Sequence, residues 1–425
     1  MAIKSLIFKT LVFAAVVCTS GTNNGKPAIA HLQQEKRPQM EDRYPGLSVS
    51  PSGQLMLNDS PFKGVGVNYF NAFIRTLDQG HTDDTSYLRG FAYLQERKIP
   101  FIRFALNGYW PNNWDLYLKH PDRFFENLDD FVKAAEHYKI GLIPSFFWHT
   151  PTVPDLVAEP VNEWGNPDSK TSALMRKFVR EVVLRYRDSP AIWGWEQGNE
   201  VNLLVDLPGD NDHLPPTVPS LGTPAIRYSR DKLNSRDLIA MMEEFAREVR
   251  RYDNTRIVIS GNAIPRQAAH HLWHHQSWQT DDKQQFMDIL GKQNPDPLDV
   301  ISIHLYPSST EEGYFSDGEA DMDKLIATSM EASRRHGKPL FLGEFGTQEL
   351  KLGPKIARSL FLDVLSSIEK NGVPLSAMWV FDYPPHDGEE GINVSPLNGP
   401  REYMLEGIMK LNERLASGTR VTIEK

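Results

Sequence analysis

The chain has 425 residues, 40% of them hydrophobic and 24% charged, which is the balance of a soluble globular protein. Its formal net charge is -9 and it has no run of basic residues, so the composition argues against nucleic acid as a partner. Cys18 is the only cysteine, which excludes an internal disulfide and a catalytic or metal-binding cysteine in the mature protein.

The first predicted element is a secretory signal peptide over residues 1–30. A basic start precedes a short apolar run at 11–17, and small and polar residues follow. The run is too short to span a membrane. We therefore expect a secreted or periplasmic protein with no membrane span, and a lipid anchor on Cys18 is the less favoured alternative. Residues 31–47 are expected to form a disordered arm, and 48–425 a single folded domain.

Short β-branched or aromatic runs alternate with longer helical patterns along this domain. The predicted strands are 62–69, 99–105, 141–147, 191–196, 256–260, 299–304, 339–343 and 377–381. The predicted helices are 85–97, 128–138, 172–186, 235–252, 321–336 and 354–370, with a weaker candidate between 278 and 290. This alternation implies parallel strands joined by right-handed crossovers. Eight units favour an α/β fold of the (β/α)8 TIM-barrel type, and an open doubly wound sheet is the alternative.

Two glutamates stand where predicted strands end, Glu200 after the fourth and Glu344 after the seventh. In a barrel the active site lies at the carboxyl ends of the strands. One such glutamate is usually a solvated loop residue. Two of them, at strands that lie roughly opposite each other, indicate the pair of carboxyl groups that glycoside cleavage needs. One would protonate the leaving oxygen, and the other would attack the sugar or activate water.

Other strand ends supply residues that suit such a pair. Arg103, on the second strand, needs an acidic partner and is expected near the glutamate of strand seven, although a purely structural salt bridge is the alternative. His304 and Tyr306 point the same way from the sixth strand, and Tyr306 can donate a hydrogen bond to the nucleophile. Trp379 on the eighth strand can form an apolar floor under a sugar, and His149 ends the third strand.

Further aromatic and amide side chains near the strand ends are candidate sugar contacts. The candidate stacking platforms are Tyr69, Phe70, Trp110, Trp114 and Trp148, and the candidate polar contacts are Asn68 and Asn262. Aromatic faces suit the apolar faces of sugar rings, but ordinary packing explains each of these residues equally well when it is taken alone.

Taken in chain order, these residues resemble glycoside hydrolase family 5, within the clan A retaining glycosidases, over about residues 47–415. The matching residues are Arg103, His149, Asn199, Glu200, His304, Tyr306, Glu344 and Trp379. The resemblance implies double displacement, with Glu344 as the nucleophile and Glu200 as the acid/base. It implies carboxyl groups roughly 5–5.5 Å apart. It also implies a raised pKa for Glu200, an ionised Glu344 beside Arg103, and a contact of Asn199 with the sugar 2-hydroxyl.

The resemblance implies no cofactor and a β-linked glucan, mannan or related oligosaccharide as the substrate. Val201 stands where many family members have proline, and a long loop, 201–234, follows it. The identity of the sugar therefore stays open. An exo-acting β-glycosidase or a transglycosylase is the alternative, depending on whether the loops 201–234 and 382–400 close one end of the cleft. We expect a monomer.

Two readings from other classes are weighed against the glycosidase. Residues 270–275 contain histidines spaced i, i+4, which can chelate a metal on a helix. No acidic ligand or supporting carboxylate is apparent locally, so we expect no metal, and a metal-dependent hydrolase is disfavoured. A non-catalytic sugar-binding barrel would be expected to have lost one of the two carboxylates, and both are present.

Overall fold

The structure is a computed structural model that describes residues 46–77, 82–209, 212–307, 314–318, 320–396 and 399–417. The predicted signal peptide and residues 31–45 of the predicted arm lie outside these ranges. Within them, no helix is both long enough and apolar enough to cross a membrane.

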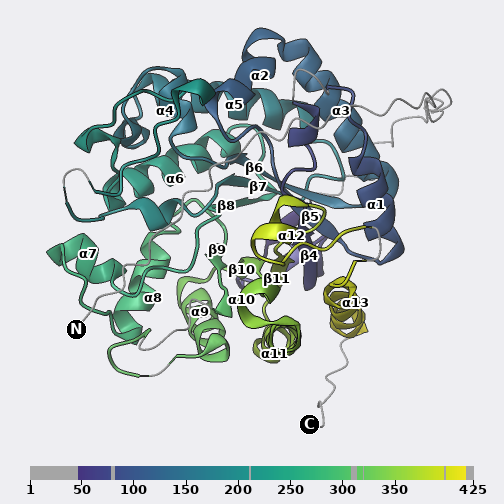
Figure 1. Ribbon diagram of the computed structural model, residues 1–425. Coiled ribbons are helices and arrows are strands. Elements are labelled where there is room, and N and C mark those ends of the chain that lie inside the picture. The colour runs from purple at the N-terminus through teal and green to yellow at the C-terminus, as the bar shows by residue number, and fades with distance from the viewer. Residues whose placement is uncertain are drawn as a thin grey trace. The chain divides into compact units, whose positions relative to one another are not determined.

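Eight parallel strands form the central sheet, in the order β8-β7-β6-β5-β4-β11-β10-β9 (Figure 1). They are β4 (Gly64–Asn68), β5 (Phe101–Ala105), β6 (Gly141–Phe147), β7 (Gly194–Gly198), β8 (Ile257–Ile259), β9 (Ile301–His304), β10 (Leu340–Phe345) and β11 (Leu375–Met378). The amide of Asp299 donates to the carbonyl of Val258 at 3.0 Å and links the two ends of the sheet. The predicted (β/α)8 barrel is confirmed, and the open doubly wound sheet is wrong.

Helices surround the strands, as Figure 1 shows. The longer helices are α1 (Tyr87–Glu96), α3 (Pro121–Tyr138), α5 (Lys170–Tyr186), α6 (Ser235–Arg250), α8 (Lys283–Lys292), α9 (Met322–His336), α11 (Pro354–Asn371) and α13 (Glu402–Ser417). Shorter helices lie in the loops, namely α2 (Asp115–Lys119), α4 (Thr152–Leu156), α7 (Ala269–His275), α10 (Glu349–Leu352) and α12 (Pro385–Glu389). Single 3-10 turns are η1 (Ile74–Thr76), η2 (Pro111–Trp114), η3 (Val161–Gly165), η4 (Val201–Leu204), η5 (Pro219–Leu221) and η6 (Ser229–Asp231).

The helix α6 illustrates how sequence produces these elements. Its buried side chains include Leu238, Met242, Phe245 and Val249, which recur at three- and four-residue spacing and form one apolar stripe against the sheet. At its start, the side chain of Asn234 accepts hydrogen bonds from two amides of the first turn. This capping satisfies donors that have no partner within the helix.

A small antiparallel sheet lies at the amino-terminal end of the barrel. It consists of β1 (Leu47–Val49), β2 (Leu55–Leu57) and β3 (Ser60–Pro61). Leu47 and Leu55 are buried in one apolar cluster with Phe101, Ile143 and other residues of the barrel strands. The sheet therefore seals the end of the barrel opposite the strand carboxyl ends. The predicted arm is wrong at its last residue, because Leu47 is a buried strand residue.

Two details of the chain differ from the predicted elements. Trp379 follows β11 instead of lying on it. Its amide donates to the carbonyl of Phe345 on β10, and the amide of Phe381 donates to the carbonyl of Asn68 on β4, so the regular ladder of hydrogen bonds has ended here. The helix α13 was not predicted. The side chain of Asn412 on α13 bonds both the amide and the carbonyl of Val65, at 2.8 and 2.9 Å, which fixes this helix against the first barrel strand.

Candidate active site

Glu200 lies just beyond the end of β7, in a backbone conformation that side chains rarely adopt. Its φ is 52°, in the left-handed region, and its amide donates to the carbonyl of Gly261 at 2.8 Å. Residues held in this region cost free energy and concentrate at functional sites. This backbone conformation directs the Glu200 side chain into the barrel mouth, where 28% of it is exposed.

Glu344 lies on β10, where the strand register shifts between Leu342 and Glu344. Irregularities of this kind re-aim a side chain. Here Glu344 is paired with His304 of β9, and only 6% of its side chain is exposed. The most buried end of the site is therefore the Glu344 end.

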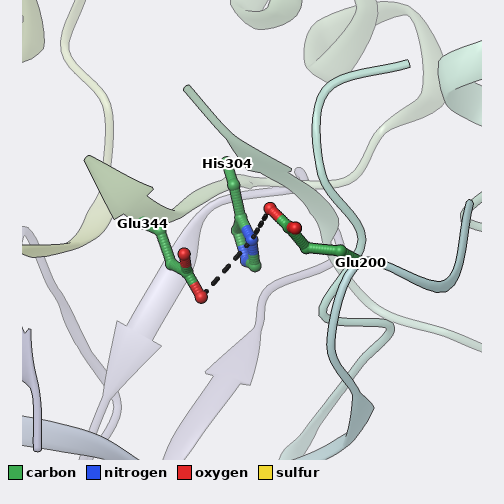
Figure 2. Close-up of side chains that lie close together, drawn as sticks. All are labelled: Glu200, His304 and Glu344. Carbon is green, nitrogen blue, oxygen red and sulfur yellow. Dashed lines mark hydrogen bonds and ion pairs between the residues drawn. The ribbon is translucent and has the colours of Figure 1, made fainter. Parts of the chain in front are cut away.

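The two carboxyl groups meet across His304, as Figure 2 shows. Nδ1 of His304 lies 3.0 Å from Oε1 of Glu200 and 3.5 Å from Oε1 of Glu344. One atom from each of the three side chains lies within 4.8 Å of the others. This spacing is close to the roughly 5–5.5 Å of retaining glycosidases and well short of the roughly 6.5–9.5 Å that leaves room for water in inverting ones.

Arg103 is fully buried beneath this pair and has several polar partners. Nε contacts the carboxylate of Glu196 at 2.7 and 3.0 Å, and Nη1 donates to Oε1 of Glu344 at 2.7 Å and to Oδ1 of Asn68 at 2.9 Å. Nη2 donates to Oδ1 of Asn199 at 2.8 Å. The planar guanidinium group has its N–H donors in fixed directions, so it holds Glu344 and Asn199 in a fixed position relative to each other.

Glu196 is a member of this network that the sequence analysis did not single out. It lies on β7, is fully buried, and forms the second ion pair of Arg103. Burial raises the pKa of Glu196, and the charge of Arg103 opposes that effect. A carboxylate in the interior of an apolar strand was the available signal, since buried charges need partners.

The other oxygen of Glu344 is also held. The hydroxyl of Tyr306 donates to Oε2 of Glu344 at 2.7 Å, the contact expected from the sequence. Each oxygen of Glu344 therefore accepts a hydrogen bond from a different side chain, Arg103 on β5 and Tyr306 just after β9. This leaves the carboxylate little freedom to rotate.

The pKa values of Glu200 and His304 differ from their usual values. Removal from water raises the pKa of Glu200 to about 7, despite the opposing charges of Arg103 and Arg266, so the predicted raised pKa is confirmed. Burial lowers the pKa of His304 to about 3, more than Glu344 raises it. His304 is therefore neutral near pH 7, while Glu200 exchanges a proton in that range.

Trp148, which precedes His149 after β6, lies against Arg103. The Arg103 guanidinium lies 4.4 Å from the centre of the Trp148 ring, and Trp379 lies alongside Trp148 at 6.0 Å. His149 instead stacks on Tyr109 at 4.1 Å. Nδ1 of His149 also lies 3.0 Å from the Thr152 hydroxyl, so the loops after β5 and β6 hold this ring, and its role in substrate binding stays a prediction.

Several other predicted sugar contacts are parts of the protein interior. Tyr69 and Trp114 are in the main core, and the hydroxyl of Tyr69 donates to Asp382 at 2.7 Å. Trp110 is buried next to His149. The platform prediction is therefore wrong for Tyr69 and Trp114.

The two asparagines predicted as sugar contacts are fully buried as well. The amide nitrogen of Asn68 donates to the Gly343 carbonyl at 2.8 Å while its oxygen accepts from Arg103. The amide nitrogen of Asn262 donates to the Gln293 carbonyl at 2.7 Å. Both side chains form hydrogen bonds to other protein groups, and Asn68 helps to position Arg103. Neither asparagine is therefore placed to contact a sugar.

The long loop 201–234 is tied down by buried charge. Nη1 and Nη2 of Arg227 bond both oxygens of Asp155 on α4, at 2.6 and 2.7 Å, and both side chains are almost fully buried. The side chain of Asn112 also bonds the carbonyl of Ser220 at 3.0 Å. The described part of the loop is thus fixed against the loops after β5 and β6.

Metal binding can be considered at two places. Within the described residues, Glu200, His304 and Glu344 are the group of three whose donor atoms lie close enough to share an ion. On α7, Nδ1 of His271 lies 2.7 Å from Oδ1 of Asp281, so the expectation of no supporting carboxylate there is wrong. The absence of a catalytic metal stays a prediction.

A TIM barrel that brings two carboxyl groups together at the ends of its fourth and seventh strands is the architecture of a retaining glycoside hydrolase. Residues 71–382 match the family described as cellulase (glycosyl hydrolase family 5). The chain belongs to glycosyl hydrolase family 5, a family of O-glycosyl hydrolases.

Individual relatives are more distant. Mannan endo-1,4-beta-mannosidase F of Aspergillus clavatus is 33% identical over 81 residues, which are 18% of this chain and 18% of that protein. The solved endo-1,4-beta-mannanase of Rhizomucor miehei has a TM-score of 0.61 at 15% identity, covering 88% of this chain and 99% of its own. A family 5 mannosidase from the same organism has a TM-score of 0.61 at 12% identity, covering 88% and 98%. At these identities the solved structures show the shared fold.

Proposed function

We propose that this protein hydrolyses β-linked glycosides with retention of configuration. The observation that carries the proposal is the close approach of Glu200 and Glu344 at the barrel mouth, with a pKa of about 7 on Glu200 and two donors on Glu344. The two carboxyl groups differ in environment, and that difference assigns acid/base to Glu200 and nucleophile to Glu344.

In the first step the carboxylate of Glu344 attacks the anomeric carbon. The bond from that carbon to the glycosidic oxygen breaks, an ester to Glu344 forms, and the proton of Glu200 goes to the departing oxygen. Arg103 and Tyr306 hold the attacking carboxylate in place. The hydrogen bond between His304 and Glu200 orients the acid.

In the second step Glu200, now a carboxylate, takes a proton from water as the water oxygen attacks the anomeric carbon. The ester breaks and Glu344 is restored. Two inversions at one carbon give net retention. Asn199 has its oxygen on Arg103, and its amide nitrogen has no protein partner among the described residues, so this nitrogen can donate to the sugar 2-hydroxyl.

The substrate we propose is a β-linked glucan, mannan or related oligosaccharide. Family membership supports this class, and the names of the relatives in A. clavatus and R. miehei refer to mannan or mannose. The indole of Trp379, half-buried at the barrel mouth, supplies the apolar face that a pyranose ring needs.

The test is a panel of aryl β-glycosides and β-linked polysaccharides, with Glu344→Gln and Glu200→Gln compared with wild type. Glu344→Gln should lose activity on every substrate. Glu200→Gln should retain the first step on a dinitrophenyl glycoside, because that leaving group needs no proton. Glu126→Gln, on the exposed face of α3, is the matched control. Near wild-type turnover by Glu344→Gln would contradict the nucleophile assignment, and a chelator that stopped wild-type turnover would contradict a metal-free mechanism.

We also propose that the protein is exported and acts as a monomer. The basic and apolar pattern of residues 1–30 supports export. Mass spectrometry of protein recovered from the medium or periplasm should show a chain that lacks this segment. Light scattering on the purified protein should give the mass of one chain, and a dimer mass would contradict the monomer.

A further inference from the structure

A packed group of aromatic rings lies at one side of the barrel mouth. Phe70 follows β4, Trp148 follows β6 and Tyr383 follows β11, and we call these three residues the aromatic wall. Their exposed fractions are 8%, 8% and 5%. The ring of Phe70 lies 4.7 Å from that of Trp148, 5.4 Å from that of Tyr383 and 5.9 Å from that of Trp379.

These spacings leave no room for a sugar ring between the aromatic side chains. A ring sandwiched between two others needs them about 7 Å apart, since each contact takes about 3.5–4.0 Å. Trp148 and Trp379 are 6.0 Å apart, and Phe70 is closer than this to both Trp148 and Tyr383. A sugar can therefore lie against Trp379, but a chain cannot continue through the wall.

Two of the three wall residues, Phe70 and Tyr383, lie across the barrel from Glu200, while Trp148 follows β6, the neighbour of β7. Phe70 and Tyr383 follow the adjacent strands β4 and β11, whereas Glu200 follows β7, three strands away from β4 in the barrel order. Glu200 must reach the glycosidic oxygen, so the leaving part of the substrate lies on the Glu200 side. In a pyranose ring C4 is opposite C1, so the 4-hydroxyl of the bound sugar points toward Phe70 and Tyr383 of the wall.

The exposure of the site residues agrees with this direction. The side chain of Glu200 is 28% exposed, whereas that of Glu344 is 6% exposed. Asn199, beside Glu200, is also only partly buried. The side for the leaving group is thus the one in contact with solvent.

The wall is held in place by polar contacts behind it. The amide of Tyr383 donates to Oδ1 of Asn393 at 2.6 Å, and Nε of Arg401 donates to the Asn393 carbonyl at 2.6 Å. Nε1 of Trp379 donates to Nδ1 of His386 at 3.2 Å. The loop after β11 is therefore fixed in the closed arrangement by several buried contacts.

We propose that this enzyme is exo-acting: it accepts a single sugar unit on the non-reducing side and releases monosaccharides from the non-reducing ends of β-linked oligosaccharides. This inference rests on the proposed function and adds its mode of action. The aromatic wall is the device that excludes a second glycone unit, and the substrates are chains with a free non-reducing end.

The experiment uses the full-length enzyme and aryl β-oligosaccharides of five sugar units. In one set the non-reducing 4-hydroxyl is free, and in the other the 4- and 6-hydroxyls of the non-reducing sugar are joined as an ethylidene acetal. The free set should release monosaccharide as the first product, and the blocked set should react at least about 100-fold more slowly. Equal rates on the two sets, or di- and trisaccharides as first products, would overturn the exo assignment. An aryl β-monoglycoside is run beside them. Turnover of none of these substrates, with no ester formed on Glu344 by a 2-fluoro glycosyl fluoride, overturns the proposed function itself and the inference with it.

A second measurement concerns the wall directly. The variant Tyr383→Ala removes one ring of the wall without altering the residues that contact the reacting atoms. We expect this variant to raise, at least about tenfold, the ratio of the hydrolysis rate on the blocked substrates to the rate on the free substrates. Tyr403→Ala, which removes a ring packed on Phe361 of α11, should leave the ratio unchanged. An unchanged ratio in a folded Tyr383→Ala enzyme would show that the wall does not limit the glycone side.

Discussion

At the scale of single residues, Arg103 joins the stability of the barrel to the geometry of the site. It is the shared cation of two buried carboxylates, Glu196 and Glu344, on different strands. Removing one partner of a buried ion pair leaves an uncompensated charge, which is far more costly than the pair itself is worth. The same side chain therefore cannot be changed without affecting both folding and catalysis.

We expect Arg103→Lys to lower kcat/KM by about 100-fold or more and the free energy of unfolding by about 3 kcal/mol. An ammonium group keeps the charge but cannot reach Glu196, Glu344 and Asn199 together. Steady-state kinetics and urea unfolding measure the two effects. The control is Arg185→Lys, which alters an ion pair with Asp129 that is 45% exposed at the arginine and should cost less than about 1 kcal/mol. Equal effects of the two substitutions would contradict the role of Arg103.

The raised pKa of Glu200 predicts how activity depends on pH. Its pKa is raised to about 7, and it must be protonated to donate in the first step. As pH rises through about 7 the proton is lost, so kcat/KM on a substrate with a poor leaving group should fall tenfold for each further pH unit. Measurement between pH 5 and 9 on wild type and Glu200→Gln checks this. The alkaline limb should be missing from the Glu200→Gln variant on a dinitrophenyl glycoside, and its persistence there would assign it to another group.

At the scale of elements, the site depends on how closely β7 approaches the chain after β8. Gly261 has a φ of +73°, and a Cβ atom there would lie 1.9 Å from the carbonyl oxygen of Gly198. Its own carbonyl accepts the amide of Glu200. A side chain at position 261 must push the end of β7, and with it the acid/base, out of place.

Gly261→Ala should therefore reduce kcat by about 100-fold, the size of effect expected when a catalytic group moves by about 1 Å. Gly337→Ala is the matched control, because Gly337 has a φ of +65° but open space around it. That control should lose only about 1 kcal/mol of stability through backbone strain and keep its activity. Circular dichroism and kinetics on both variants distinguish displacement of the site from strain alone.

At the scale of the whole molecule, the barrel needs a seal at the end away from the active site. The sheet of β1, β2 and β3 supplies it, with Leu47 fully buried among barrel side chains. Leu47 and Leu55, which lie before the first barrel strand, are thus part of the apolar cluster that fills this end of the barrel. The stability of the domain is thus expected to depend on a segment remote from the chemistry.

Leu47→Ala should lower the free energy of unfolding by about 3 kcal/mol, the cost of a cavity in a packed core. Val49→Ala, at a half-buried position of the same strand, should cost about 1 kcal/mol. Urea midpoints measure both, and kcat below the transition should match wild type. A loss for Leu47→Ala no larger than for Val49→Ala would show that the sheet does not seal the barrel.

The sequence by itself determined the barrel and the place of the two glutamates. Eight alternations of strand and helix leave few topologies, and barrel geometry then brings all strand ends to one mouth. For the same reason Arg103, His304 and Tyr306 could be assigned to the site. These conclusions depend on order along the chain and on the period of side-chain direction, which a sequence carries directly.

Only the tertiary structure decided what each side chain contacts. It placed Trp148 against Arg103 and His149 against Tyr109, made Glu196 a partner of that arginine, and buried Tyr69 in the core. Strand period tells which face a residue is on, but near a strand end the turn of the chain sets direction, and the register shift before Glu344 has no local signature. The closed glycone side follows from ring-to-ring distances between loops far apart in sequence, which depend on packing alone.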